Sequence, residues 1–275
     1  MLLGEEAGAV PAAHEAMTDF TTPAILLRRT DYGDYDRILT CFTLSQGKIA
    51  AIAKYARKSQ KRFAGVLELF TELRVVCSRR RAGGLAVLKE ASLVRPYAAI
   101  RSNVARMAYA SFWAEMVNLW MEDGQAQATV FRLLQYVLCE LDAGRLSAEK
   151  LSLIFQVRFL AAAGFCPDFR HCSRCKKNIA DLKSADFSFN IARAELLCAQ
   201  CRVSSAAQWV LSRKTIMQLL WIAETDLAAA GRIRLSPDAQ AQALELFESF
   251  VPYHLGRAPH SLKFLKQMRR RVNAP

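Results

Sequence analysis

Four of the eight cysteines form two closely spaced pairs in the stretch HCSRCKKNIADLKSADFSFNIARAELLCAQC, which covers residues 171–201. Cys172 and Cys175 form the first pair, and Cys198 and Cys201 form the second. The two-residue spacing lets both sulfurs of a pair reach one ion, and four thiolates suit tetrahedral Zn²⁺. Between the pairs, FSFN and ELLC have the pattern of a hairpin that brings the second pair to the first. The spacing therefore predicts a zinc ribbon with one Zn²⁺ per chain.

Three other interpretations of the cysteine pairs compete with zinc: a redox motif, disulfides and a ribbon without metal. A thioredoxin-type motif needs its cysteines at the start of a helix, which CSRCKKN does not resemble, and disulfides are disfavoured in the cytoplasm. Four thiolates close the coordination sphere, so the site is expected to be structural. We expect Cys166 and His171 not to be ligands, and Cys41, Cys77 and Cys139 to be core residues.

A second group of residues suited to binding is the basic run KYARKSQKRFAG, which is flanked by aromatic residues. Cations on a mobile loop neutralise phosphates, while a nearby aromatic ring stacks on an unpaired base. A solvated basic loop is the alternative interpretation. The predicted DNA contacts are Arg28, Arg37, Lys54, Tyr55, Arg57, Lys58, Lys61 and Arg62.

Motifs that would indicate catalysis are missing from the sequence. It contains no G-x-x-x-x-G-K-[ST] phosphate loop and no H-E-x-x-H metal motif. The four histidines are spread between residues 14 and 260, and DYGDYD is better explained as a turn than as a calcium loop. We therefore expect no enzymatic activity.

Composition and charge limit the class of protein. Hydrophobic residues make up 52% and charged residues 23% of the 275 residues, as in globular proteins. No run of eighteen uncharged apolar residues occurs, and the acidic N-terminus lacks the basic region of a signal peptide, so we expect a soluble cytoplasmic protein. Residues 19–95 hold 15 basic and 7 acidic residues, while residues 96–275 hold 23 and 15. The higher positive charge density of residues 19–95 favours a polyanionic partner, nucleic acid before an acidic membrane surface.

The period of the hydrophobic pattern changes near residue 95, which predicts two kinds of domain. Short alternating runs at 24–29, 36–43, 48–53, 67–78 and 85–94 predict five strands, separated by glycine-containing turns. Five strands without a long helix favour an OB-fold barrel, a fold that binds nucleic acids.

After Pro96 the pattern becomes helical. Apolar residues recur at helical spacing over 130–141, Ser147 is a candidate cap for a helix that ends at Gly164, and Ser236-Pro237 begins another helix. The predicted fold class is α+β. A disordered extension (1–18) precedes an OB-fold domain (19–95), which is followed by a helical domain (96–275) with an inserted four-cysteine zinc ribbon (166–203).

The sequence resembles the RecO family of bacterial DNA-repair and recombination mediators over essentially residues 20–267. The resemblance begins with AILLRRTDYGDYDRILTCFTLSQGKIAAIAKYARKSQKRFAGVLELFTEL and continues through GFCPDFRHCSRC, FSF…LLCAQC and YHLGRAPHSLKFL. It implies an OB-fold, a helical domain and, in many members, a zinc site. It also implies binding to single- and double-stranded DNA and annealing of complementary strands. With RecR, such a protein would load RecA onto DNA covered by single-strand-binding protein (SSB), in the cytoplasm at the nucleoid.

The resemblance also implies that the acidic, hydrophobic-ended tail of SSB docks on the helical domain. We place it between the helices expected near 98–122 and 126–142, with Arg106 and Arg132 as carboxylate contacts. The alternative function, of another class, is a zinc-ribbon protein–protein adaptor without direct DNA binding.

Two positions in the ribbon depart from the family pattern. Relatives often have glycine after the second cysteine, where this chain has Lys176, and a glycine pair before LLC, where it has Ala194 and Glu195. We expect these residues to strain the turns that carry the cysteines. Residues 1–16 precede the resemblance. We expect them to be a disordered tail, or to result from a misplaced start codon.

Overall fold

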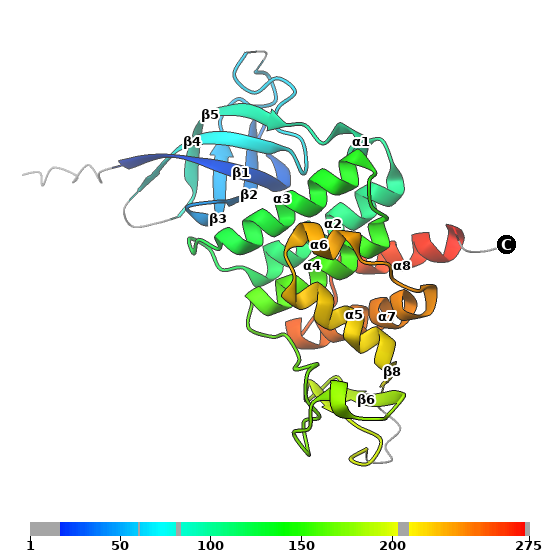
Figure 1. Cartoon of the computed structure of the whole chain (residues 1–275). Coiled ribbons are helices and arrows are strands. Elements are labelled where there is room, and N and C mark those ends of the chain that lie inside the picture. Colours follow the sequence, from blue (N-terminus) through cyan, green and yellow to red (C-terminus); the bar gives the residue numbers. More distant parts are fainter. Residues whose placement is uncertain (1–16, 60, 81–83, 203–208, 273–275) are drawn as a thin grey trace, which may run out of the picture.

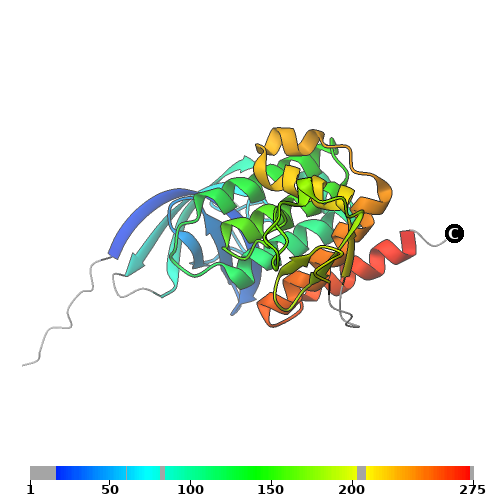
Figure 2. The same cartoon turned by 60° about the horizontal axis from the view of Figure 1, so that its bottom comes forward.

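The computed structural model describes residues 17–59, 61–80, 84–202 and 209–272. A β-barrel lies at one end of the molecule, helices form the middle, and a small sheet lies at the opposite end (Figure 1). With the bottom of the molecule turned forward, the small sheet lies in front of the helices and the barrel lies to one side (Figure 2). The helices are α1 (Ala98–Arg101), α2 (Val104–Trp120), α3 (Ala128–Ala143), α4 (Ala148–Ala162), α5 (Arg213–Glu224), α6 (Leu227–Arg232), α7 (Pro237–Leu255) and α8 (His260–Val272).

Five strands form the closed barrel: β1 (Met17–Tyr32), β2 (Asp36–Thr43), β3 (Gly47–Ala53), β4 (Glu72–Arg80) and β5 (Ala86–Arg95). They are hydrogen-bonded in the order β1-β2-β3-β5-β4, and the ring closes between β4 and β1. Neighbouring strands are antiparallel except β3 and β5, which are parallel. Inward-facing residues such as Leu26, Leu39, Ile49 and Val75 fill the interior. The predicted OB-fold barrel is confirmed.

Two boundaries in the barrel differ from the prediction. Met17 and Thr18 belong to β1, because they pair with the end of β4, so the predicted extension 1–18 is too long by these two residues; residues 1–16 lie outside the described residues. The strand predicted over 67–78 begins only at Glu72. Phe70 has a φ of +68° and donates its N–H to Leu26 O at 2.8 Å, so the chain turns there instead of extending.

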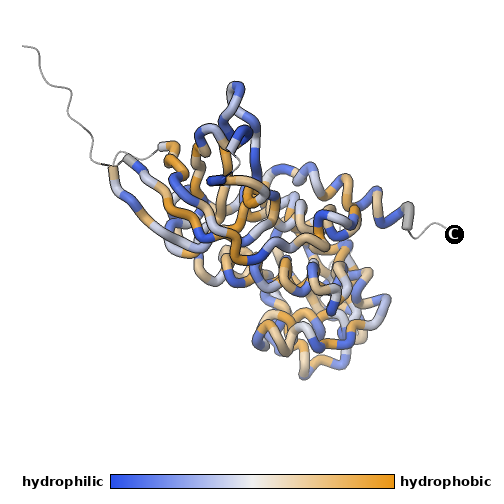
Figure 3. The backbone as a smooth tube through the Cα atoms, turned by 90° about the horizontal axis from the view of Figure 1, so that it is seen from above, coloured by the Kyte–Doolittle hydropathy of each residue, from blue (hydrophilic) through white to orange (hydrophobic). Residues whose placement is uncertain are grey.

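The helix expected near 98–122 is divided into α1 and α2, whereas the boundaries of α4 and the start of α7 are where the sequence indicates. The Ser147 hydroxyl accepts from the Lys150 N–H at 3.3 Å and caps α4. Gly164 follows this helix with a φ of +78°, which costs glycine little. Pro237 is the first residue of α7. The C-terminal helix α8 is hydrophilic along much of its length (Figure 3).

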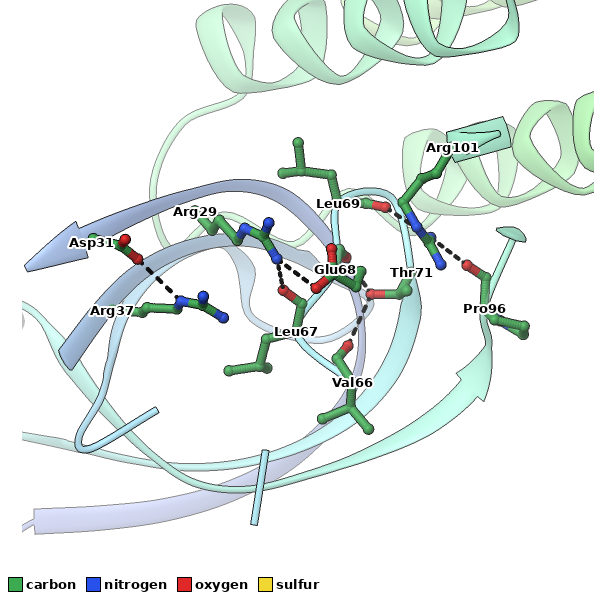
Figure 4. A network of polar contacts seen from close by, with 10 residues as sticks. All are labelled: Arg29, Asp31, Arg37, Val66, Leu67, Glu68, Leu69, Thr71, Pro96 and Arg101. Atoms are coloured by element: carbon green, nitrogen blue, oxygen red, sulfur yellow. Dashed lines mark hydrogen bonds and ion pairs between the residues drawn. The ribbon is translucent and has the colours of Figure 1, made fainter. Parts of the chain in front are cut away.

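The barrel packs directly on the helices. Ile25, Leu27, Phe42 and Phe70 belong to the core of the helical part, and the rings of Phe42 and Phe131 lie 6.2 Å apart. Polar contacts reinforce this junction: the Arg101 guanidinium donates to Leu69 O at 3.3 Å and to Pro96 O at 2.6 Å (Figure 4).

A buried carboxylate also joins the two parts. Glu72 accepts from the Tyr97 hydroxyl at 3.1 Å and from the Gln135 amide at 2.7 Å. A buried carboxylate is costly unless it is satisfied, so these bonds fix β4 against α3.

The small sheet contains the predicted hairpin and one further strand. Strand β6 (Asp186–Asn190) pairs with β7 (Glu195–Leu197) and, on its other edge, with β8 (Trp209–Ser212). The ribbon therefore extends beyond the predicted range of 166–203, because β8 completes its sheet. The ring of Phe189 stacks on Phe169 at 5.7 Å and lies 6.0 Å from Phe250 of α7, so the ribbon shares the core of the helices.

Candidate metal centre and nucleic-acid interface

The structure brings the sulfurs of the four paired cysteines together. Those of Cys172, Cys175, Cys198 and Cys201 lie within 4.8 Å of one another, and the Cys175 and Cys198 sulfurs are 4.0 Å apart. A tetrahedral Zn²⁺ with metal–sulfur distances of about 2.3 Å separates its sulfurs by about 3.8 Å. Four thiols at this spacing fit a single metal ion.

Turns at the ends of the hairpin position the sulfurs. After the first cysteine, the Lys176 N–H donates to Cys172 O at 2.9 Å, and the Cys201 N–H donates to Cys198 O at 3.0 Å in the second turn. The Ser173 N–H donates to Leu196 O at 2.7 Å, and the Ser173 hydroxyl accepts from the Leu196 N–H at 3.1 Å. These two bonds hold the first turn against β7, which leads into the second pair.

Two of the ribbon residues at which the sequence departs from the family pattern have positive φ angles. Lys176 has a φ of +60° and Ala194 a φ of +53°, in the left-handed region where a side chain costs about 1–2 kcal/mol. The expected strain is therefore present at Lys176, in the turn of the first cysteine pair, and at Ala194, in the turn between β6 and β7. Glu195 lies in β7 without a positive φ, and the residues of the turn 198–201 also lack one.

The electrostatics of the cluster favour a cation. Burial raises the pKa of the Cys172 thiol, but backbone N–H groups of Cys198, Cys175 and Arg174 stabilise the thiolate more strongly and lower this pKa to about 6. Burial and hydrogen bonds to the other thiols raise the pKa of Cys201 to about 12. Neighbouring thiolates repel one another, and a divalent cation supplies the charge that allows all four to be ionised.

The other cysteines lie outside this cluster. Cys166 contacts Pro167 O at 3.6 Å, and burial raises the pKa of its thiol. His171 Nδ1 lies 3.1 Å from an Asp168 carboxylate oxygen. Cys41 and Cys77 are buried in the barrel, as expected, and Cys139 is half-buried against the helical core.

Most of the predicted DNA contacts gather at one end of the barrel. The loop between β3 and β4 projects from the barrel, away from the small sheet (Figure 1). Its side chains Lys54, Tyr55, Arg57, Lys58, Lys61 and Arg62 are all exposed.

One acidic residue partly neutralises this group. Asp31 pairs with Arg37 at 3.1 Å (Figure 4) and with Arg57 at 3.6 Å. Nearby, the Arg29 guanidinium is bound by Glu68 at 2.7 Å and by Leu67 O at 2.9 Å. The loop lysines and Arg62 are therefore the cations best placed for a polyanion.

The aromatic residues near the loop have different environments. Phe63 is buried in the barrel core, where it cannot stack on a ligand. Tyr55 is exposed, and its ring stacks on Tyr35 at a centroid distance of 6.1 Å. Sequence reasoning missed Tyr35, although the hairpin register could have found it: Arg37 pairs with Ala53, which places residue 35 opposite residue 55.

Three predicted residues lie elsewhere. Arg28 lines a cavity of about 460 Å³ between the barrel and α2, together with Glu115 and His260. Arg106 donates to Asp142 O at 2.9 Å, at the end of α3, whereas Arg132 is exposed near the start of that helix. Ten residues of helix separate positions 132 and 142, or about 15 Å, so the structure does not bring the two arginines together.

None of the helices that the structure describes has the length and apolar character needed to cross a membrane.

Comparison with known proteins connects these features to one family. Residues 17–97 match the family model "Recombination protein O N terminal", and residues 101–263 match "Recombination protein O C terminal". A DNA repair protein RecO from Desulfosudis oleivorans is 45% identical over 258 residues, which cover 92% of this chain and 99% of the relative.

Two further relatives carry the same name. The protein from Desulfatibacillum aliphaticivorans is 43% identical over 256 residues, with 93% of this chain and 99% of the relative covered. The protein from Anaeromyxobacter sp. (strain K) is 34% identical over 244 residues, with 89% and 94% covered. The chain therefore belongs to the RecO family of DNA repair and recombination proteins.

Proposed function

We propose that this protein is a DNA-binding recombination mediator without enzymatic activity of its own. It binds single- and double-stranded DNA on the barrel and anneals complementary strands. With RecR, it helps to load RecA onto single-stranded DNA covered by SSB, in the cytoplasm at the nucleoid. The OB-fold domain (19–95) carries the DNA, and the helical domain (96–275) carries the ribbon and the SSB contact.

The observation that carries the proposal is the exposed basic loop between β3 and β4. Its exposed cations lie in a loop of a barrel whose fold is suited to nucleic-acid binding. Lys and Arg side chains that neutralise phosphates release counterions, which gives affinity with little sequence preference. Annealing follows from the same charges, because two strands near one basic surface repel each other less.

We assign the four cysteines to one structural Zn²⁺ per chain. Bound there, the metal would hold the two turns of the ribbon together and leave no open position for substrate. The small sheet is at the opposite end of the molecule from the barrel, so DNA need not contact it (Figure 1).

For the SSB tail, we propose an extended path between Arg106 and Arg132 on the helical domain. A peptide of about five residues in extended conformation spans the ~15 Å along α3 between Arg132 and Asp142, the residue that Arg106 contacts. Arg106 is engaged by Asp142 O, so its carboxylate contact requires a remaining N–H. Tail-peptide binding that is undiminished in the double alanine variant would exclude this path.

Titration of labelled single-stranded DNA at two salt concentrations tests the main proposal. We expect the affinity to fall steeply as salt rises, because phosphate contacts release counterions. Absence of DNA binding at low salt would instead favour the protein–protein adaptor. Release of cleaved or modified DNA without an added partner would contradict the non-enzymatic assignment.

A further inference from the structure

A stacked pair of exposed tyrosines stands at the base of the basic loop. Tyr35 lies in the turn between β1 and β2, and Tyr55 follows β3. The ring centroids are 6.1 Å apart and the planes differ by 16°, an offset-stacked arrangement. Tyr55 is 66% exposed and Tyr35 is 39% exposed, so the pair presents aromatic surface to solvent.

The backbone fixes this pair in place. The Tyr55 N–H donates to an Asp36 carboxylate oxygen at 2.8 Å, and the Arg57 N–H donates to Tyr35 O at 3.0 Å. These bonds extend the β2–β3 hairpin, whose register places the two tyrosines opposite each other. Cross-strand aromatic pairs stabilise such a hairpin, but that role alone does not require the exposure of Tyr55.

Tyr55 also has an unfavourable backbone conformation. Its φ of +58° is in the left-handed region, which bulky residues rarely occupy and which glycine or asparagine adopts at lower cost. Strain of this kind gathers at ligand-binding positions, where it is part of the function. An exposed, strained and stacked tyrosine is poorly explained by folding alone.

Positive charges surround the pair. The Lys58 ammonium lies 3.8 Å from the centre of the Tyr35 ring, and the Asp31 carboxylate holds the guanidinium groups of Arg37 and Arg57 nearby. Aromatic faces beside cations bind single-stranded nucleic acid, with bases stacked on the rings and phosphates on the charges.

We propose that the Tyr35–Tyr55 pair is a stacking platform for one unpaired base and gives the barrel a preference for single strands over duplex. Tyr55 contacts the base with its free surface, and Tyr35 is a positioning residue that supports it from behind. Duplex DNA gains little affinity from the pair, because its bases already stack on each other and do not expose their faces. This inference rests on the proposed DNA binding and names the contact that distinguishes the two substrates.

Matched titrations of the full-length protein test the platform. We would compare wild type, Tyr55→Ala and Tyr35→Ala on labelled oligo-dT and on a mixed-sequence duplex at one salt concentration. Loss of one base-stacking contact weakens binding by about 5- to 150-fold. We expect this loss on oligo-dT for Tyr55→Ala and a smaller loss for Tyr35→Ala, with duplex affinity changed by less than about 2-fold and the salt slope unchanged.

Conservative and distant variants serve as controls. Tyr55→Phe and Tyr35→Phe should keep oligo-dT affinity, because the ring is retained. Tyr253→Ala on α7, which removes a tyrosine of similar exposure (56%), should change neither substrate. A Tyr55→Trp variant adds a direct readout, since oligo-dT stacked on the indole should quench its fluorescence more than duplex does.

Two outcomes would overturn the platform: equal losses on both substrates, or unchanged oligo-dT affinity in folded Tyr55→Ala. Both leave the proposed function intact if the wild type binds DNA with a steep salt dependence. Wild-type protein that binds neither substrate would overturn both the platform and the proposed DNA binding. Because Ala retains a Cβ, the substitution does not relieve the left-handed backbone, and unfolding curves establish that each variant is folded.

Discussion

The barrel and the ribbon are both small β-structures, but different interactions stabilise them. The barrel closes its strand ladder and fills it with buried residues of its own, such as Leu39, Ile49 and Leu73. The ribbon has three short strands, and its Phe187 and Phe189 belong to the core of the helices. A closed barrel leaves its outer loops free to carry binding residues, whereas the ribbon depends on its sulfur cluster and on α7.

Cysteine itself behaves differently in the two regions. In the barrel, burial raises the pKa of Cys41 to about 12 and that of Cys77 to about 11, so both remain protonated at neutral pH. In the ribbon, backbone N–H groups overcome burial and lower the pKa of Cys172 to about 6. The same side chain is a packing residue in the barrel and a metal-ligand candidate in the ribbon, where four thiols lie together and backbone N–H groups stabilise the thiolate of Cys172.

The largest expected effect comes from breaking the sulfur cluster. Cys198→Ser should lose about one Zn²⁺ per chain and destabilise the ribbon. We expect a loss of about 3–5 kcal/mol in the free energy of unfolding, less than the ~10–16 kcal/mol of isolated zinc-finger peptides. The loss is smaller because Phe169 and Phe189 remain packed on the helices. Metal analysis and urea unfolding measure the two effects.

Cys166→Ser is the matched control for this substitution. It removes a thiol at the start of the ribbon but outside the cluster, so the protein should retain its metal. DNA binding by the barrel should persist wherever Cys198→Ser is folded. A folded, zinc-free variant that no longer binds DNA would show that the ribbon belongs to the binding surface.

The next largest effect is expected on DNA binding, when basic residues are removed from the barrel and not from the ribbon. A variant with five substitutions replaces the loop cations by alanine: Lys54, Arg57, Lys58, Lys61 and Arg62. Each lost phosphate contact should reduce the log–log salt slope by about 0.7–0.9 and weaken binding to all sequences alike. Arg57 should contribute least, because Asp31 already pairs with it.

A second five-fold variant keeps the same change of net charge. It replaces the exposed ribbon cations Arg174, Lys176, Lys177, Lys183 and Arg193 by alanine. If DNA lies on the barrel, this control should leave the salt slope nearly unchanged. Equal effects of the two variants would mean that the total charge matters and not the position of the loop.

A third prediction tests how tightly the barrel is packed against the segment before α3. A Cβ added at Gly47 would lie 2.1 Å from Gln125 O, and Gly47 has a φ of +62°. Gly47→Ala should therefore cost about 1–2 kcal/mol for the backbone conformation, plus the energy of moving the segment before α3. Urea unfolding should give a total of about 3 kcal/mol.

Gly33→Ala is the control, because Gly33 has a similar φ of +55° but no atom within 4 Å of an added Cβ. Gly33→Ala should therefore lower the free energy of unfolding only by the cost of the left-handed backbone conformation, about 1–2 kcal/mol. Equal costs for the two variants would mean that the junction yields easily.

Features fixed by local spacing could be predicted from the sequence. The five strands follow from alternation between glycine turns, the cysteine cluster follows from two C-x-x-C pairs around a hairpin, and the capped start of α4 follows from Ser147. Each depends on a short motif in the sequence, and the two cysteine motifs are joined by a hairpin that is itself visible in the pattern.

Features set by distant packing could not be predicted in the same way. The apolar run before Glu72 reads as a strand, yet Leu67 faces the barrel interior while Phe70 packs on the helices. Strand β8 has only four residues, too few for a reliable period, and it forms by pairing with β6. The turn that contains Tyr35 could be predicted, but the stacking of its ring on Tyr55 depends on the register of β2 and β3, which brings residue 55 opposite residue 35.

The smallest effect should come from relieving the strained turns of the ribbon. Lys176→Gly and Ala194→Gly each remove a left-handed cost of about 1–2 kcal/mol. Each also adds chain entropy to the unfolded state, worth about 0.5–1 kcal/mol. The net gain in the free energy of unfolding should be about 0.5 kcal/mol per site.

Ala192→Gly is the control. Ala192 lies in the same turn as Ala194 but has no positive φ, so this substitution should slightly destabilise the protein. Urea unfolding and the rate of metal release to a chelator measure these effects, and slower release from the double variant would show that strain in the turns acts on the metal site. A double variant less stable than wild type would show that the side chains of Lys176 and Ala194 support the turns more than their conformation strains them.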